Sequence, residues 1–342
     1  MTSEAGAPEQ FGPYLLFLGD TTQPGYAKTA FGLRDWAPKL CVGEAALPGA
    51  TVTTGLNRMT TGEAFGAGAR ALIIAVATPG GLIPEHWLPT LKQAIVDGLD
   101  LVAGMHSKLA DITELRDAAE KHGARLIDVR VPPPNIAVGS GARRSGRRLL
   151  TVGTDCALGK KYTALAIARG LQDRGMDVSF RASGQTGIMI AGQGIPIDAV
   201  VADFVSGAAE MLSPAANPDH LDVIEGQGSL FHPAYAAVSL GLLHGSQPDM
   251  FVVCHQPART HVLGHPEFAL PSIEEVIDRT IALGQLTSPQ IRCAGVSLNT
   301  SDLSPDEARE VIQSHADRLG LAVADPVRGG PEFEQFLDAC AQ

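Results

Sequence analysis

The chain has 342 residues, which is long for a single hydrophobic core and sufficient for two domains. Apolar residues make up 45% of it and charged residues 18%, the ordinary balance of a globular protein. The net charge of -11 argues against a nucleic-acid partner or an anionic membrane surface, because both are bound through basic patches, but it does not exclude a small anionic ligand.

The first half of the chain alternates short apolar runs with helical patterns. The run "ALIIAVATPGG" is the strongest strand pattern, because its β-branched residues stop at a glycine- and proline-rich turn. A helix is predicted over 111–123, where Asp111 can cap the first turn and Gly123 can end the last. The alternation indicates a parallel sheet covered by helices. The predicted strands are 14–20, 71–81, 99–106 and 124–130, and the predicted helices are 87–98 and 111–123.

Two segments interrupt this alternation. Residues 19–30 ("GDTTQPGYAKTA") imitate a phosphate-binding turn, but no glycine directly precedes Lys28, and we expect no helix to begin there. Residues 131–148 hold three consecutive prolines followed by small and basic residues, which is typical of a boundary between domains. We therefore predict an N-terminal domain over 1–145 and a C-terminal domain over 146–342.

The second half begins again with a strand at 148–154, a loop, and a helix at 161–175. Further apolar runs, such as "PDMFVVCH" and "IRCAGVSLN", each end in polar residues. In parallel α/β sheets, ligands bind at the carboxyl ends of the strands, so this second domain should carry a site at that edge. The residues expected at the edge are Asp155, Ser183, Glu225, His255 and Asn299.

The loop "VGTDCALGKKYT" (152–163) has the pattern of a phosphate-binding loop between a strand and a helix. In such a loop several N–H groups point at an anion, and the helix dipole adds positive potential. Gly153, Gly159 and Lys160 supply the glycines and the lysine, although the spacing is one residue longer than standard. A tight turn with a lysine at its end is the structural alternative. The residues assigned to cofactor binding here are Gly153, Thr154, Asp155, Cys156, Ala157, Gly159, Lys160, Lys161, Tyr162 and Thr163.

The residue after the loop lysine is Lys161, where nucleotide hydrolases carry a hydroxyl that binds magnesium. A lysine cannot do so, because it has no acceptor, and Thr163 stands about 200° further round the helix. Two adjacent lysines suit a ligand with several phosphates and no metal, such as coenzyme A. ATP stays possible if carboxylates such as Asp155 and Glu225 alone hold the magnesium.

Several further residues are candidates for binding and catalysis. Glu225 follows a strand and is either a general base, a metal ligand or a turn-capping carboxylate. Arg181 and Arg259 are candidates for binding substrate carboxylates, with a surface ion pair or a polar loop as the structural alternative. His255 and His261 are candidates for substrate binding and proton transfer. The remaining assignments are Ser183 to substrate binding, Gln185 or Gln227 to an oxyanion and Asn299 to an adenine base.

The five cysteines are scattered and form no CxxC pair, so we expect a reducing cytoplasm and no zinc ribbon. Cys156 lies in the phosphate loop, where a nucleophilic role is conceivable but a small loop residue is the favoured interpretation. The N-terminal segment "MTSEAGAPEQFG" lacks the charged and apolar regions of a signal peptide, and no apolar run reaches the ~20 residues of a membrane span.

Five motifs give the chain a resemblance over 11–335 to one bacterial family: "AKTAFGLRDW", "GTDCALGKKYTA", "RASGQTGIMI", "ADFVSGAAE" and "IEGQGSLFHPAY". That family, first described as a domain of unknown function, pairs a Rossmann-like domain with a P-loop domain similar to dethiobiotin synthetase. It includes a D-glutamate N-acetyltransferase. The resemblance implies acetyl-CoA as donor and D-glutamate as acceptor, but it does not identify the base.

The sequence therefore predicts an α/β protein with two parallel-sheet domains that acetylates a D-amino acid. Glu225 or His261 would deprotonate the amine, and no metal would be required. We expect small-molecule partners and a homo-oligomer. Two alternatives stay open: an ATP- and magnesium-dependent ligase or kinase, and a non-catalytic nucleotide or acyl-CoA sensor.

Overall fold

The structure, a computed structural model, describes residues 11–342, so the segment considered for a signal peptide lies largely outside it. The chain forms two compact units. The N-terminal unit contains the residues up to Pro132 together with Gln185–Pro196, and the C-terminal unit contains Pro133–Gly184 and Ile197–Gln342. No helix of the described residues is long and apolar enough to cross a membrane.

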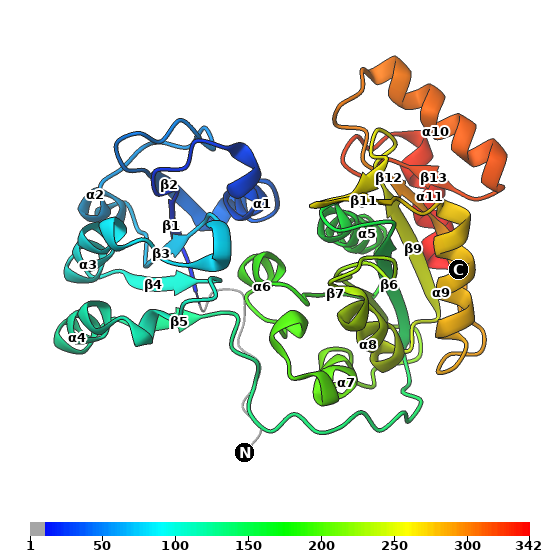
Figure 1. Cartoon of the computed structure of the whole chain (residues 1–342), viewed down its shortest axis with the longest axis horizontal. Coiled ribbons are helices and arrows are strands. Elements are labelled where there is room, and N and C mark those ends of the chain that lie inside the picture. Colours follow the sequence, from blue (N-terminus) through cyan, green and yellow to red (C-terminus); the bar gives the residue numbers. More distant parts are fainter. Residues whose placement is uncertain (1–10) are drawn as a thin grey trace. The chain divides into compact units, whose positions relative to one another are not determined.

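The N-terminal unit is built on a five-stranded parallel sheet of order β2-β1-β3-β4-β5. Helices α2, α3 and α4 pack in a row on one face of it, and α1 packs with α6 (Figure 1). The elements are β1 Tyr14–Phe17, α1 Lys28–Trp36, β2 Cys41–Ala45, α2 Thr61–Gly66, β3 Ala71–Ile74, α3 Leu88–Val96, β4 Asp100–Ala103, α4 Thr113–His122, β5 Leu126–Asp128 and α6 Gln185–Ala191.

Helix α6 belongs to this unit although it follows β7 of the other sheet. The hydroxyl of Tyr14 donates to the carbonyl of Met189 at 3.3 Å, and the hydroxyls of Thr29 and Thr186 lie 2.9 Å apart. A five-stranded sheet needs helices on both faces to bury its apolar strands, and α6 joins α1 in that task. From the sequence, no helix was predicted over this segment, and Gln185 within it was assigned to an oxyanion.

Two helix starts differ from the sequence prediction. A helix does begin at Lys28, although Ala27 gives it no side-chain cap. Asp111 does not cap α4: it lies in a short 3-10 turn, and α4 starts after Ile112. The predicted end is confirmed, because Gly123 adopts φ 72° directly after His122.

The C-terminal unit is built on a six-stranded parallel sheet of order β13-β12-β9-β6-β8-β7. Helices α5 and α11 pack on one face of this sheet and enclose a hydrophobic core with it (Figure 1). Helix α8 lies against β6, α9 lies against β9, and α7 packs on α8. The elements are β6 Arg147–Gly153, α5 Lys160–Asp173, β7 Val178–Arg181, α7 Val205–Leu212, β8 Leu221–Ile224, α8 Ala236–Ser246, β9 Met250–His255, β10 His261–Val262, β11 His265–Ala269, α9 Ile273–Gly284, β12 Arg292–Leu298, α10 Pro305–Leu319, β13 Val323–Ala324 and α11 Pro331–Ala341.

The compact units divide after Pro132, and the domain boundary near residue 145 stays a prediction. The segment between these positions has no regular structure, yet it is bound to the C-terminal unit. Glu210 accepts hydrogen bonds from the backbone N–H groups of Ser140 and Gly141, and Arg144 donates to the carbonyls of Ser213 and Gly245. Its proline-rich composition indicated a boundary between domains, and these contacts attach it to helices α7 and α8 of the C-terminal unit.

Both sheets are parallel and covered by helices, which confirms the predicted fold class. Because all strands of the second sheet run in one direction, their carboxyl ends share one edge. The polar residues expected at that edge either end a strand or follow one closely. The sequence pattern thus located the edge correctly.

Candidate active site

The turn between β6 and α5 has the backbone geometry of a phosphate-binding loop. Gly159 is the residue before the helix and adopts φ 108°, a conformation that favours glycine, with open space where a side chain would begin. Helix α5 then starts at Lys160, so its first N–H groups point toward the loop. The loop and the helix end together form an anion-binding geometry.

Lys160 is buried and folds back onto its own loop. Its Nζ donates to the backbone carbonyl of Asp155 at 2.7 Å. Burial lowers the pKa of this lysine, while the neighbouring Cys156, Cys254 and Asp155 oppose that change. An anionic ligand in the loop would favour the charged form and draw the ammonium group to itself.

Asp155 is fully buried and is held by three donors. Its carboxylate accepts hydrogen bonds from the N–H of Cys156 at 2.6 Å, from Arg259 at 2.9 Å and from the N–H of Leu263 at 2.8 Å. Arg259 also donates to the carbonyl of Cys156 at 2.7 Å. The hairpin of β10 and β11 is therefore tied to the phosphate loop through one carboxylate.

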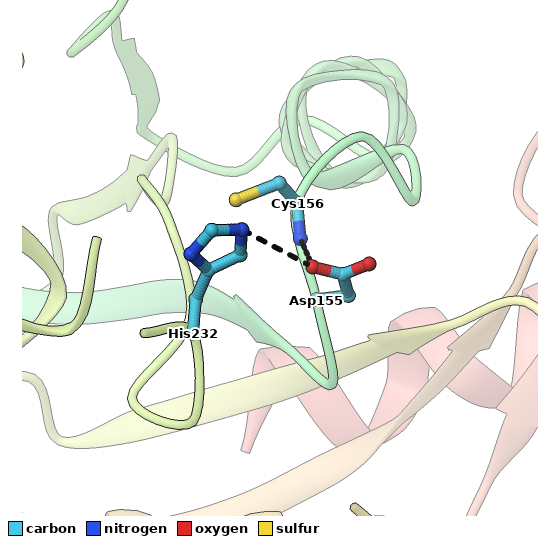
Figure 2. Close-up of side chains that lie close together, drawn as sticks. All are labelled: Asp155, Cys156 and His232. Atoms are coloured by element: carbon cyan, nitrogen blue, oxygen red, sulfur yellow. Dashed lines mark hydrogen bonds and ion pairs between the residues drawn. The ribbon is translucent and has the colours of Figure 1, made fainter. Parts of the chain in front are cut away.

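Asp155, Cys156 and His232 bring a carboxylate, a thiol and an imidazole within 4.8 Å of one another (Figure 2). The imidazole Nδ1 accepts a hydrogen bond from the N–H of Ala234 at 3.1 Å, so the proton of the neutral ring is on Nε2, which faces Asp155 at 3.9 Å. A metal bound at Nε2 would need that proton on Nδ1 instead. Because Arg259 also neutralises Asp155, these residues do not fit a metal ion.

Glu225 is a buried carboxyl group directly after β8. Its Oε2 accepts hydrogen bonds from the backbone N–H groups of Ser183 and Gly184, both at 3.0 Å. Burial raises the pKa of Glu225 to about 7, although the nearby Lys161 and the two N–H groups act to lower it. This carboxyl group can therefore exchange a proton near neutral pH.

The backbone around Glu225 is fixed by close contacts. The hydroxyl of Ser183 donates to the carbonyl of Glu225 at 2.5 Å and accepts from Gln227 at 2.9 Å. Gly226 passes so close to β6 that a side chain on it would collide with the carbonyl of Thr151. Ser183, predicted to bind substrate, thus uses its hydroxyl to position the catalytic candidate.

His255 and Asn299 end or follow neighbouring strands. The Nδ1 of His255 lies 3.0 Å from the hydroxyl of Thr154, and burial lowers the pKa of His255 to about 4. It is therefore neutral at physiological pH and unsuited to proton transfer there. The N–H of Asn299 donates to the carbonyl of His255, and its side-chain oxygen accepts from the N–H of Ser301.

The other predicted residues are not gathered around Glu225 by contacts in the described part of the chain. Arg181 donates to the buried Asp222 at 2.6 Å. His261 is exposed, with its ring 2.9 Å from the hydroxyl of Thr260. Gln185 lies in α6 of the N-terminal unit, beside Gly104. Their assigned roles stay predictions.

Three further residues assigned to the phosphate loop, Lys161, Thr163 and Ala157, differ in their surroundings. Lys161 lies over the ring of Tyr162, with its Nζ 5.2 Å from the ring centroid. The hydroxyl of Thr163 is buried, 2.7 Å from that of Ser297 in β12. Ala157 adopts φ 55° in the loop.

Residues 135–334 match a domain-of-unknown-function family, DUF1611, described as a P-loop domain, and residues 42–132 match its Rossmann-like N-terminal domain. The chain belongs to the DUF1611 family. A crystal structure of a DUF1611 protein from Anabaena variabilis covers 95% of this chain and 97% of its own, with a TM-score of 0.84 and 33% identity.

Two curated relatives extend along nearly the whole chain. A protein from Pseudoalteromonas sp is 48% identical over 93% of this chain and 96% of its own length. A protein from Tritonibacter scottomollicae is 47% identical over 96% of this chain and 98% of its own length. Both are named D-glutamate N-acetyltransferase. The family resemblance implied a Rossmann-like domain paired with a P-loop domain, and the two family matches confirm this pairing.

His232 was assigned no role from the sequence. It appeared only inside the motif "IEGQGSLFHPAY", and its position beside Asp155 depends on a loop that returns over the sheet. His232 is followed by proline in a long loop, and such a loop has no periodic pattern from which its position beside Asp155 could be predicted.

Proposed function

We propose that this protein is an enzyme that transfers the acetyl group of acetyl-CoA to the amino group of D-glutamate. The two relatives that carry this name share 48% and 47% of their aligned residues with it over nearly their whole length. The structural observation that supports the reaction best is Glu225, a buried carboxyl group with a pKa of about 7 at the sheet edge that carries the phosphate loop.

The donor would be held by its phosphates. Gly159, the first N–H groups of α5 and Lys160 form the anion site, and Lys161 adds a second cation. Asn299, at the end of β12, is the proposed contact for the adenine base. Phosphate anchoring without hydrolysis is what an acetyl donor needs.

Asp155 weighs against the ATP-dependent alternative. A magnesium ion would need carboxylate oxygens, since Lys161 replaces the usual hydroxyl. The carboxylate of Asp155 already accepts from Arg259 and from two backbone N–H groups. This pairing favours a metal-independent function for the loop.

The chemical step balances with one base. The Glu225 carboxylate takes a proton from the substrate ammonium group, and the neutral amine attacks the thioester carbonyl carbon, forming the C–N bond. The side-chain N–H of Gln227 would donate to the oxyanion. The C–S bond then breaks, the coenzyme A thiolate takes a proton, and the second ammonium proton leaves to solvent as the amide forms.

Arg181 and Arg259 stay the proposed contacts for the acceptor's carboxylates, with His255 and His261 as further polar contacts. Each arginine already pairs with an aspartate of the chain. A guanidinium group has five N–H donors, so a second carboxylate can share it. The substrate carboxylate would then share the guanidinium group of Arg181 with Asp222, or that of Arg259 with Asp155.

The test is a thiol-release assay with acetyl-CoA, a panel of D- and L-amino acids, and EDTA. Release of free coenzyme A with D-glutamate, and formation of N-acetyl-D-glutamate, is the expected result. ADP formation from ATP and magnesium with no thiol release would establish the ligase or kinase alternative. Tight binding of acetyl-CoA with no turnover on any amine would establish the sensor.

A further inference from the structure

Four aromatic and imidazole rings form a continuous row beside the phosphate loop. The ring centroids of Tyr235 and His232 lie 4.5 Å apart, those of His232 and His265 lie 5.2 Å apart, and those of His265 and Phe268 lie 6.1 Å apart. The four residues, called the ring row below, come from two segments: the loop that follows β8 and the hairpin of β10 and β11.

The ring row is fixed to the phosphate loop at its centre. His232 is buried and faces the carboxylate of Asp155 at 3.9 Å, and the same carboxylate holds the N–H of Leu263 in the hairpin. Asp155 itself lies between β6 and the phosphate-binding Gly159. The ring row is therefore attached to the loop in which a ligand would be anchored by its phosphates.

The other end of the row is connected to Glu225. Tyr235 closes the loop that starts at Glu225, and its carbonyl accepts a hydrogen bond from Ser239, which also donates to the carbonyl of Gln227. The ring row thus borders both the loop that would bind phosphates and the segment that carries the proposed base.

The outer members of this surface are apolar and exposed. Tyr235 is 52% exposed, Phe268 is 44% exposed, and Leu263, next to the row in the hairpin, is 53% exposed. The central His232 is held in its neutral tautomer by the N–H of Ala234. The surface therefore suits an uncharged ligand segment that packs against rings.

We propose that the ring row and Leu263 form the subsite for the pantetheine arm of the acyl-CoA donor, the uncharged chain of methylene and amide groups between the pyrophosphate and the thioester. This inference rests on the proposed function. The arm has to run from the phosphates in the loop to a thioester within reach of Glu225, and the ring row is the apolar surface that adjoins both.

Phe268→Ala and Tyr235→Ala test the proposal with three ligands. We expect each to raise KM for acetyl-CoA about tenfold, because an aromatic contact and its buried area are lost. KM for S-acetyl-pantetheine, which is the arm alone, rises by a similar factor. Kd for 3′-phosphoadenosine 5′-diphosphate, which lacks the arm, stays at the wild-type value. Both side chains are about half exposed, so thermal unfolding should show intact folding.

The matched control is Phe65→Ala, which removes a phenylalanine of similar exposure (41%) from the N-terminal unit. It should leave all three constants unchanged. Leu263→Ala is a second variant on the proposed surface and should raise both KM values by a smaller factor.

Three results would overturn the proposal. Weakened binding of 3′-phosphoadenosine 5′-diphosphate in Phe268→Ala or Tyr235→Ala would place the adenine base on the ring row. Unchanged KM for both acetyl donors would show that the arm lies elsewhere, with the proposed function intact. If the wild-type protein itself neither binds coenzyme A nor releases it from acetyl-CoA, the proposed function fails first and the subsite fails with it.

Discussion

The two sheets begin with the same arrangement, a strand, a turn and a helix that starts with a lysine, but only one turn has a phosphate-binding geometry. In the C-terminal unit, Gly159 precedes the helix at φ 108°, and Lys160 is buried against its own loop. In the N-terminal unit, Ala27 precedes the helix at φ -93°, and Lys28 is exposed. A lysine at a helix start is therefore not sufficient, because the loop must also curl inward.

The aspartates of the two turns differ in the same way. Asp155 is fully buried and is neutralised by Arg259, whereas Asp20 is half-exposed and accepts from the side chains of Trp87 and His86. Asp155 holds the β10–β11 hairpin on the loop, whereas Asp20 joins the buried Trp87 to the exposed His86. Burial, and not the residue pattern, therefore distinguishes the turn with the phosphate-binding geometry from the turn at Lys28.

A second contrast concerns two buried glutamates, Glu44 in β2 and Glu225 directly after β8. Glu44 accepts hydrogen bonds from Thr53 and from both the N–H and the hydroxyl of Thr54, at 2.6–2.7 Å. Glu225 accepts from two backbone N–H groups at 3.0 Å, and its pKa rises to about 7. The hydrogen bonds of Glu44 stabilise its carboxylate in a structural role, whereas Glu225 can accept a proton near neutral pH.

The largest expected effect comes from breaking the Asp155 ion pair. Arg259→Met leaves a buried carboxylate without its cation, which costs about 3 kcal/mol in the free energy of unfolding. His86→Ala at the exposed Asp20 should cost less than about 1 kcal/mol. Urea unfolding of both variants measures the difference. Equal losses would mean that the two aspartates are equivalent.

Neutralising the two glutamates should change stability in opposite directions. The folded-state pKa of Glu225 is raised, so its ionisation opposes folding: the cost is absent below the unfolded pKa of 4.5 and complete above about 7. Glu225→Gln should therefore gain about 3 kcal/mol relative to wild type between pH 4 and pH 8. Glu44→Gln should be less stable than wild type at pH 8, because strong hydrogen bonds are weakened. Unfolding curves at both pH values decide this; a gain in Glu44→Gln would contradict it.

The two lysines should differ in ligand binding. Lys160→Ala should weaken coenzyme A binding by about 10- to 100-fold, because a charge-assisted contact to phosphate is lost. Lys28→Ala should leave binding unchanged. Isothermal titration calorimetry with coenzyme A makes the comparison, and a similar loss in both variants would move the phosphate site away from the second turn.

The smallest effect is expected from glycines in matched conformations. Gly159 has φ 108° and Gly68 has φ 104°, and neither has a neighbour within 4 Å of an added Cβ. Gly159→Ala and Gly68→Ala should each lose about 1–2 kcal/mol of stability from backbone strain alone. Only Gly159→Ala should also weaken coenzyme A binding. Unaltered binding in that variant would show that the loop tolerates a different backbone.

The sequence was sufficient for the sheet edge and insufficient for long-range packing. Parallel strands that end in polar residues placed Glu225 and Asp155 correctly, because strand direction alone decides where the carboxyl ends meet. The helix at Lys28 was missed because Ala27 offers no capping side chain. Helix α6 was missed because tertiary contacts with Tyr14 and α1, far away in the sequence, stabilise a short helix in a glycine-rich segment.

Pairing of charges was equally hidden from the sequence. Arg181 and Arg259 resembled free carboxylate-binding groups, but each has an aspartate partner that comes from a distant strand or loop. The raised pKa of Glu225 depends on burial by surrounding elements, which no local pattern encodes.

The central proposal, that Glu225 accepts the amine proton, is tested most directly by the pH dependence of kcat/KM for D-glutamate at saturating acetyl-CoA. Glu225 is ionised above its pKa, so the rate should be present above about pH 7 and should fall as the pH drops through it. Glu225→Gln should lose about 10²- to 10⁴-fold in rate together with that acidic limb. The control Glu120→Gln, at an exposed position of α4, should match the wild type. A Glu225→Gln enzyme that keeps the wild-type rate, or one that keeps the limb near pH 7, would contradict the proposal.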